Sequence, residues 1–207
     1  GEHADGPNGP SLEGFLFPAT YDIAQPPDQQ RDAQHLVDAQ EQAFDDAFKS
    51  LDMSYAKAHH LTRYDVLKIA SMIEREAAFP GDRPLIAAVI YNRLARKMPL
   101  GIDPTIQYAK GSWAPLTAAD LAIDSPYNSR KHVGLPPTPI ANPGLASLKA
   151  AAQPAKVSYL YFVAIPGDKQ RRHFFTADYK AFLQFQRDHP PTGGATTAAT
   201  STAASTG

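Results

Sequence analysis

The most regular pattern of apolar and polar positions in this chain covers residues 61–79 and predicts one amphipathic helix. At about 100° per residue its apolar side chains fall on a single stripe, which consists of Val66, Ile69, Ala70, Ile73 and Ala77, with Leu67 and Met72 at its edges. Thr62 can cap the start of this helix, with Asp65 three residues later as the acidic partner of a capping box. The Pro-Gly pair that follows should end the helix.

Two glutamates interrupt the apolar side of this helix. Glu74 and Glu76 both project into the apolar arc, whereas Lys68, Ser71 and Arg75 lie on the opposite side. A carboxyl held against apolar side chains has its charged form disfavoured, which raises its pKa and lets it carry a proton near neutral pH. A simpler interpretation places each carboxylate at the edge of the stripe, where it reaches water or pairs with an arginine. The pattern by itself leaves both interpretations open.

The same reasoning assigns the rest of the chain. It predicts an extended segment over 12–23, a surface helix over 28–51, a helix over 83–97, a loop over 98–112, a short helix over 116–123, a proline-rich loop over 125–144, a helix over 143–153, a hairpin with strands at 158–165 and 171–177, and a last helix over 178–188. Residues that should cap these helices are Asp82, Thr117 with Asp120, Asn142, and Asp178 with Thr176.

These elements predict an α+β fold, a mostly helical single domain with a small antiparallel β-sheet. We expect the domain to span residues 12–189. Residues 1–11 are rich in Gly and Pro and indicate a flexible lead, and the low-complexity tail over 190–207 indicates disorder.

Composition excludes several classes of function. The 20 Lys and Arg residues nearly balance 21 Asp and Glu, for a formal charge of -1, so nucleic acid is not an expected partner. There is no cysteine, and the seven histidines form no His-x3-His pair, so we expect no metal and no cofactor. The sequence also lacks the glycine-rich nucleotide motifs and the GxSxG elbow. The sequence contains no run of about 20 apolar residues, the length needed to span a membrane, so we expect that any anchor lies outside it.

The candidate chemistry is therefore acidic. The carboxyls of Glu74, Glu76 and Asp103 accompany amide, hydroxyl and aromatic groups suited to binding a sugar, on Asn92, Thr105, Tyr127 and Asn128. Glycoside cleavage needs a carboxyl that protonates the bridging oxygen. The two glutamates cannot form the pair of a retaining hydrolase, because residues two apart on a helix point to different sides. A single acid is sufficient where the nucleophile is the 6-hydroxyl of muramic acid in the substrate.

Each of these residues also has a simpler interpretation. Asp103, which precedes a proline, can be a turn residue. Asn92 can be a helix-surface amide, and the Tyr127-Asn128 loop can hydrogen-bond with itself. Two other functions stay open: a hydrolase in which Asp103 activates water, and a glycan-binding or division-scaffold module without turnover.

Taken together, these stretches resemble the catalytic domain of the YceG-like family of endolytic murein transglycosylases. The matching motifs follow the order of the family and are LEGFLFPATY at 12–21, LKIASMIEREA at 67–77, IAAVIYNRLARKMPL at 86–100, DPTIQY at 103–108, DLAIDSPYNS at 120–129, GLPPTPIANPGLASLKAAAQPA at 134–155, and YLYFVA at 159–164 with HFF at 173–175. Two positions depart from the family pattern. Gly101-Ile102 stands where Gln-Thr is usual, and Ser129 replaces a threonine but keeps the hydroxyl.

The resemblance implies specific roles. Glu74 would be the catalytic acid and base, with Glu76 as a neighbouring site residue and Asn92, Asp103, Thr105, Tyr127, Asn128 and Ser129 as substrate-binding residues. It also implies an enzyme at the extracytoplasmic face of the bacterial membrane that cuts nascent peptidoglycan strands to leave 1,6-anhydro ends. In the family, a transmembrane anchor and a small LysM-like domain precede this one, and cell-wall synthases and division proteins are expected partners.

Overall fold

The computed structural model describes residues 5–6, 9–22 and 29–190. Its helices are α1 (Gln29–Lys49), α2 (Ser54–Ala58), α3 (Arg63–Glu76), η1 (Pro80–Asp82), α4 (Arg83–Ala95), α5 (Asp103–Lys110), α6 (Ala118–Leu121), α7 (Leu145–Ala152) and α8 (Tyr179–Asp188). Its strands are β1 (Asp5–Gly6), β2 (Gly9–Pro10), β3 (Tyr161–Ala164) and β4 (His173–Thr176). The fold is α+β and mostly helical with a small antiparallel sheet, which confirms the predicted class.

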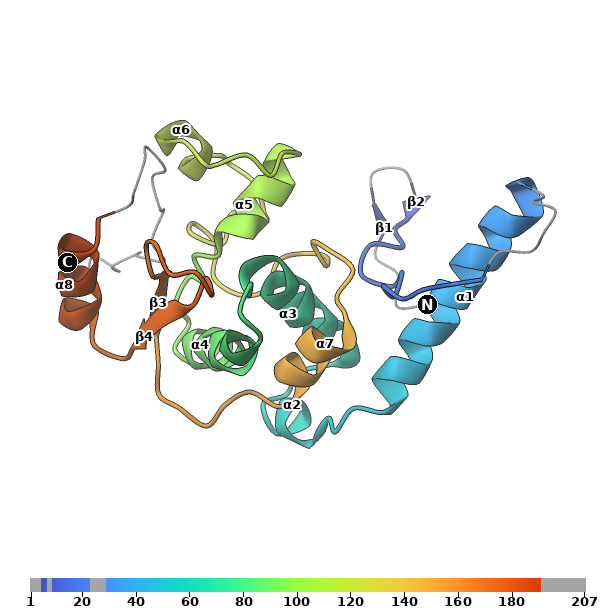
Figure 1. Ribbon diagram of the computed structural model, residues 1–207, viewed down its shortest axis with the longest axis horizontal. Helices are drawn as coiled ribbons and strands as arrows, with labels where there is room; N and C mark the ends of the chain where they lie inside the picture. Colours follow the sequence, from blue (N-terminus) through green and yellow to red (C-terminus); the bar gives the residue numbers. More distant parts are fainter. Residues whose placement is uncertain (1–4, 7–8, 23–28, 191–207) are drawn as a thin grey trace.

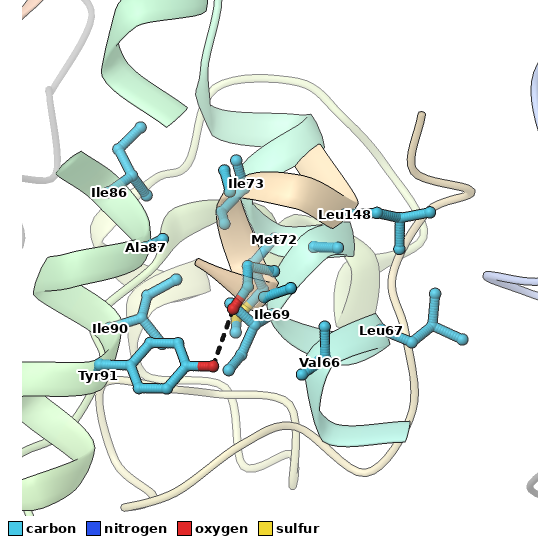
Figure 2. Packing of buried hydrophobic residues seen from close by; sticks show 14 of the residues in the cluster. Val66, Leu67, Ile69, Met72, Ile73, Ile86, Ala87, Ile90, Tyr91 and Leu148 are labelled. Carbon is cyan, nitrogen blue, oxygen red and sulfur yellow. Dashed lines mark hydrogen bonds between the residues drawn. The ribbon is translucent and has the colours of Figure 1, made fainter. Parts of the chain in front are cut away.

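Helix α3 forms the centre of the molecule, packed against α4, α5 and α7 (Figure 1). Figure 2 shows its apolar stripe meeting side chains of the neighbouring helices: Val66, Leu67, Ile69, Met72 and Ile73 of α3, Ile86, Ala87, Ile90 and Tyr91 of α4, and Leu148 of α7. Burying one such side chain stabilises the fold by about 1.5–3 kcal/mol. The Tyr91 hydroxyl donates a hydrogen bond to the Ala151 carbonyl (2.8 Å), which satisfies the polar atom inside this apolar cluster.

The ends of α3 follow from local sequence. Thr62 accepts a hydrogen bond from the Asp65 backbone N–H, and Asp65 accepts one from Thr62 in return, which confirms the capping box. The helix ends at Glu76, earlier than predicted, and the chain turns extended at Ala77. Phe79 is also extended, because a residue before proline avoids helical angles.

The predicted loop over 98–112 was wrong, because residues 103–110 form helix α5. Pro104 lies in the first turn, where its missing N–H leaves no hydrogen bond unmade, so the Asp-Pro pair starts a helix here and not a turn. Gly111 ends α5 in the left-handed conformation (φ 69°), which favours glycine.

Two predicted helix caps were wrong, because each side chain has a distant partner. The Asp82 carboxylate makes no cap hydrogen bond to α4 and contacts His173 of β4. The Asn142 side-chain oxygen accepts hydrogen bonds from the backbone N–H groups of Gly14 (2.7 Å) and Leu16 (3.3 Å). Helix α7 therefore begins later than predicted, at Leu145.

Other predicted caps were correct. Thr117 and Asp120 form a capping box at the start of α6. The Asp178 carboxylate accepts a hydrogen bond from the Lys180 backbone N–H at the start of α8. Thr176 is the last residue of β4, and its hydroxyl accepts a hydrogen bond from the Asp178 N–H.

The predicted hairpin exists as the antiparallel pair β3–β4, in which Phe162 lies opposite Phe175. Helix α8 packs on both strands, with its buried Phe182 against Tyr161. Both strands are shorter than predicted, and α4 lies against β3. We refer to β3, β4 and α8 together as the hairpin unit.

The N-terminal part of the chain covers one side of α3. Phe15 is buried against Phe44 of α1, with ring centroids 5.1 Å apart. The buried side of α1 thus centres on Phe44 and Phe48, whereas Leu36, Ala39, Ala43 and Ala47 on the same helix are only half-buried. Within the expected flexible lead, β1 pairs with β2, and the rest of that lead at 1–4 and 7–8 lies outside the described residues. The expected disordered tail also lies outside them, except for residue 190.

Candidate active site

Glu74, near the end of α3, is anchored to the start of α7. Its Oε2 atom accepts hydrogen bonds from the Ser147 hydroxyl (2.6 Å) and the Gly144 backbone N–H (3.1 Å). Gly144 is the N-cap residue of α7 and Ser147 lies in the first turn, where free N–H groups and the helix dipole favour a negative charge. The Ser147 hydroxyl also accepts a hydrogen bond from Arg83 Nε (3.3 Å). One oxygen of Glu74 is therefore engaged in joining two helices.

Glu76, the last residue of α3, has different surroundings. Its side chain is half-buried, and no group of the described residues donates a hydrogen bond to its carboxyl. The pKa of Glu76 is raised to about 8, first because burial disfavours the charged form and second because Asp103 is negatively charged, while the Arg130 cation acts in the opposite direction. A carboxyl with this pKa is protonated at neutral pH and can donate its proton.

Asp103 and Arg130 form an ion pair beside Glu76. Asp103 Oδ1 accepts hydrogen bonds from Arg130 Nη2 (2.6 Å) and Nε (3.2 Å). Burial raises the pKa of Asp103, and the charge of Arg130 opposes that shift. Three segments distant in sequence thus meet in one group of charges, which we call the Glu76–Asp103–Arg130 cluster.

Three predicted substrate-binding residues are buried behind this cluster. Thr105, Asn128 and Ser129 are at most 4% exposed. The Thr105 and Ser129 hydroxyls lie 2.8 Å apart, and Ser129 Oγ accepts a hydrogen bond from the Ile102 N–H (2.9 Å). The Asn128 amide donates hydrogen bonds to two backbone carbonyls of the preceding loop, at residues 121 and 123. These hydrogen bonds give the three side chains a role in holding Asp103 and Arg130 in place. Their contact with substrate stays a prediction.

Tyr127 and Asn92 also have partners within the protein. The Tyr127 hydroxyl lies 2.7 Å from the Thr138 hydroxyl, and its ring packs on Tyr108. Asn92 donates hydrogen bonds from its amide to the carbonyls of Val157 and Tyr159, both at 2.9 Å. The Asn92 amide thus ties α4 to the segment that leads into β3, and it is not engaged with the charged cluster.

Ser147 and Arg130 were not among the site residues predicted from the sequence. Ser147 follows the Asn-Pro-Gly turn, and neither its periodicity nor its spacing indicates that it contacts Glu74. Arg130 had a detectable signal, because it is a cation directly after Ser129 at the end of a matched motif. Among the described residues, no three His, Cys, Asp or Glu side chains are grouped closely enough to hold a metal ion.

Comparisons with known proteins cover most of the chain. Residues 3–188 match the model of the YceG-like family. Two curated relatives, both named endolytic murein transglycosylase, are 44% identical over 154 residues in Bacillus subtilis and 43% identical over 161 residues in Streptococcus pneumoniae. Both alignments cover 74% of this chain, but only 42% and 28% of the relatives, so the chain spans less than half of their length.

A solved structure shows the same fold. The crystal structure of a YceG-like protein from Listeria monocytogenes aligns with a TM-score of 0.71 and 36% sequence identity. The alignment covers 84% of this chain and 55% of that protein.

Proposed function

Because this chain belongs to the YceG-like family, we propose that it is an endolytic murein transglycosylase, as its curated relatives are named, with Glu76 as general acid and base. The observation that carries the assignment is the contrast between the two glutamates. Glu74 has one carboxylate oxygen bound by Ser147 and Gly144. Glu76 has a raised pKa and a carboxyl without a protein hydrogen-bond donor among the described residues, so its proton is available to a substrate.

The proposed reaction breaks the β-1,4 bond between N-acetylmuramic acid and N-acetylglucosamine. The Glu76 carboxyl gives its proton to the bridging oxygen as that bond breaks. The 6-hydroxyl of the same muramic acid then bonds to its own anomeric carbon, and the hydroxyl proton returns to the Glu76 carboxylate. The products are a 1,6-anhydro end and a free 4-hydroxyl, and no water is consumed. An intramolecular nucleophile has a high effective concentration, so no second carboxylate is required.

Asp103 and Arg130 act in this scheme through Glu76. The negative charge of Asp103 favours the protonated form of Glu76, which the first step needs. Arg130 holds Asp103 in place through the 2.6 Å contact and limits the rise in the pKa of Glu76. The balance keeps Glu76 protonated near pH 7 and still able to act as a base in the second step.

The substrate class sets the proposed location and partners. Nascent peptidoglycan strands lie at the extracytoplasmic face of the bacterial membrane, where cell-wall synthases and division proteins are the expected neighbours. We propose that an anchor holds the full-length protein there. No helix among the described residues has the length and apolar character needed to cross a bilayer.

The test compares the wild type with Glu76→Gln and Glu74→Gln. Each protein is incubated with purified murein at pH 7, and the products are analysed by mass spectrometry. We expect Glu76→Gln to lower the rate of anhydro-end formation by about 100-fold or more, because the proton donor is lost. Glu74→Gln should keep more activity, because a glutamine oxygen can still accept the hydrogen bonds of Ser147 and Gly144. Thermal unfolding of all three proteins controls for loss of the fold.

The products also separate the alternatives. Wild-type rates from Glu76→Gln would refute its role as acid, and a folded but inactive Glu74→Gln beside an active Glu76→Gln would assign that role to Glu74. Reducing ends that incorporate heavy oxygen from labelled water would indicate a hydrolase instead. Binding of strands without any cleavage would indicate a glycan-binding module.

A further inference from the structure

An arginine of α3 stacks on the single tryptophan of the chain. Arg75 lies between Glu74 and Glu76 on α3, and its guanidinium carbon is 3.6 Å from the ring centroid of Trp113. Trp113 follows α5, the helix that starts at Asp103, and is 44% exposed. Helices α3 and α5 pack together, so the two helices that bring Glu76 to Asp103 also bring Arg75 to Trp113.

The charge of Arg75 is not neutralised within the described part of the protein. Arg75 is exposed, and no described carboxylate forms an ion pair with it. The adjacent carboxylates are directed elsewhere, Glu74 toward α7 and Glu76 toward the cluster with Asp103 and Arg130. A guanidinium that stacks by its face on an aromatic ring keeps its N–H donors at its edges. Arg75, the residue before the proposed catalytic acid in the sequence, therefore presents an open fork of donors.

The backbone of the loop that carries the indole is held by hydrogen bonds. Gln107 of α5 donates hydrogen bonds from its side-chain amide to the carbonyls of Trp113 (3.1 Å) and Ala114 (3.0 Å). These contacts tie the loop after α5 to the helix. A cation positioned in advance loses little conformational freedom on binding, which favours affinity.

From this arrangement we infer that Arg75 and Trp113 form a subsite for a carboxylate of the peptide stem attached to muramic acid. The inference rests on the proposed function. In an intact strand the lactyl carboxyl is joined to the stem by an amide bond, so the glycan backbone is neutral and the stem supplies the carboxylates. The Arg75 fork binds such a carboxylate in the bidentate manner typical of arginine, and the exposed part of the indole packs against the apolar atoms beside it.

The single tryptophan provides a direct binding measurement. Trp113 fluorescence of the Glu76→Gln protein is titrated with soluble strands that carry acetylated stem amines, with the stem carboxylates either free or converted to methylamides. We expect saturable binding, about fivefold tighter for the strands with free carboxylates. Adding Arg75→Gln should weaken binding of those strands by about the same factor and leave binding of the amidated strands unchanged.

Two further variants sharpen the comparison. Arg75→Lys keeps the charge but not the planar fork, so we expect an intermediate affinity. Arg96→Gln serves as the matched control, because Arg96 is an exposed arginine at the C-terminal end of α4, and it should not change the preference for free carboxylates.

The inference is overturned if amidation does not change the affinity, or if Arg75→Gln weakens both kinds of strand equally or neither. The titration needs no turnover, so its outcome is separate from that of the proposed function. Carboxylate-dependent binding together with a wild type that makes no anhydro ends would remove the enzymatic proposal and keep the subsite. Formation of anhydro ends together with binding that does not depend on the stem carboxylates would keep the enzymatic proposal and remove the subsite.

Discussion

At the scale of single residues, Glu74 and Glu76 differ because helical geometry turns them about 200° apart around α3. Glu74 faces the start of α7, where a hydroxyl and a backbone N–H reach its carboxylate. Glu76 faces the start of α5, where the nearest charges are Asp103 and Arg130. The Glu74 carboxylate therefore joins two helices, whereas the Glu76 carboxyl holds a proton.

The raised pKa of Glu76 predicts a pH-dependent gain in stability for Glu76→Gln. The pKa of about 8 in the folded protein lies above the ordinary value of 4.5, so the folded state binds this proton more tightly. The tighter binding of this proton stabilises the folded state fully below about pH 4.5, and this stabilisation is lost as the pH rises through 8. Glutamine cannot ionise, so the melting temperature of Glu76→Gln minus that of the wild type should increase between pH 5 and pH 9. A difference that stays constant over this range would contradict the raised pKa.

At the scale of elements, the start of α5 is fixed by buried hydroxyls. Thr105 donates a hydrogen bond to the Ile102 carbonyl (2.7 Å), and Ser129 accepts one from the Ile102 N–H (2.9 Å). Gly101 donates its backbone N–H to the Ser129 carbonyl (2.8 Å). The segment that follows Asn128 is therefore joined to α5 by polar contacts that water does not reach, and the neighbouring Arg130 is held near Asp103.

Removing these hydroxyls should destabilise the protein in a coupled way. Thr105→Val and Ser129→Ala are each expected to lower the free energy of unfolding by about 1–2 kcal/mol, because each leaves a buried partner without its hydrogen bond. Since the hydroxyls contact each other at 2.8 Å, the double variant should lose less than the sum of the two. Urea unfolding of the four proteins measures this. Additive losses would show that the hydroxyls act independently.

At the scale of the whole molecule, two buried side chains attach the hairpin unit to the helices. Asp82 Oδ2 accepts the His173 backbone N–H (2.8 Å) and lies 2.8 Å from the same residue's Nδ1. Arg93 of α4, which is 1% exposed, donates hydrogen bonds to the carbonyls of Leu160 and Leu100. The Asp82–His173 and Arg93–Leu160 contacts join residues 91 and 67 positions apart, so the position of the hairpin unit depends on both of them.

Asp82→Ala should therefore affect the whole fold. We expect it to lower the free energy of unfolding by about 2–4 kcal/mol, because it leaves two donors of His173 without a partner in a buried site. Backbone amides of β4 should also exchange with deuterium faster. Asp46→Ala, which removes an exposed carboxylate on α1, is the matched control and should have little effect. An equal loss from both variants would show that the Asp82 contact does not hold the hairpin unit.

Much of this protein is determined by sequence alone, wherever the signal is local. The stripe of α3, the capping box of Thr62 and Asp65, the hairpin, and the caps of α6 and α8 depend on residues a few positions apart, so periodicity and spacing reveal them. The ordered motifs along the chain also indicate the family by themselves. Two acidic residues in an apolar arc were visible in the same way.

Only the tertiary structure decided how those acids are used. Sequence rules predict that Asp82 and Asn142 cap the helices that follow them. In the structure, their side chains instead bind residues 91 and 126–128 positions away. Asp103 lies in a helix rather than a turn because Pro104 fits its first turn. The contrast between Glu74 and Glu76 depends on which distant helix each side chain meets. Packing sets burial, neighbouring charge and hydrogen bonding, and these three quantities determine where a proton is held.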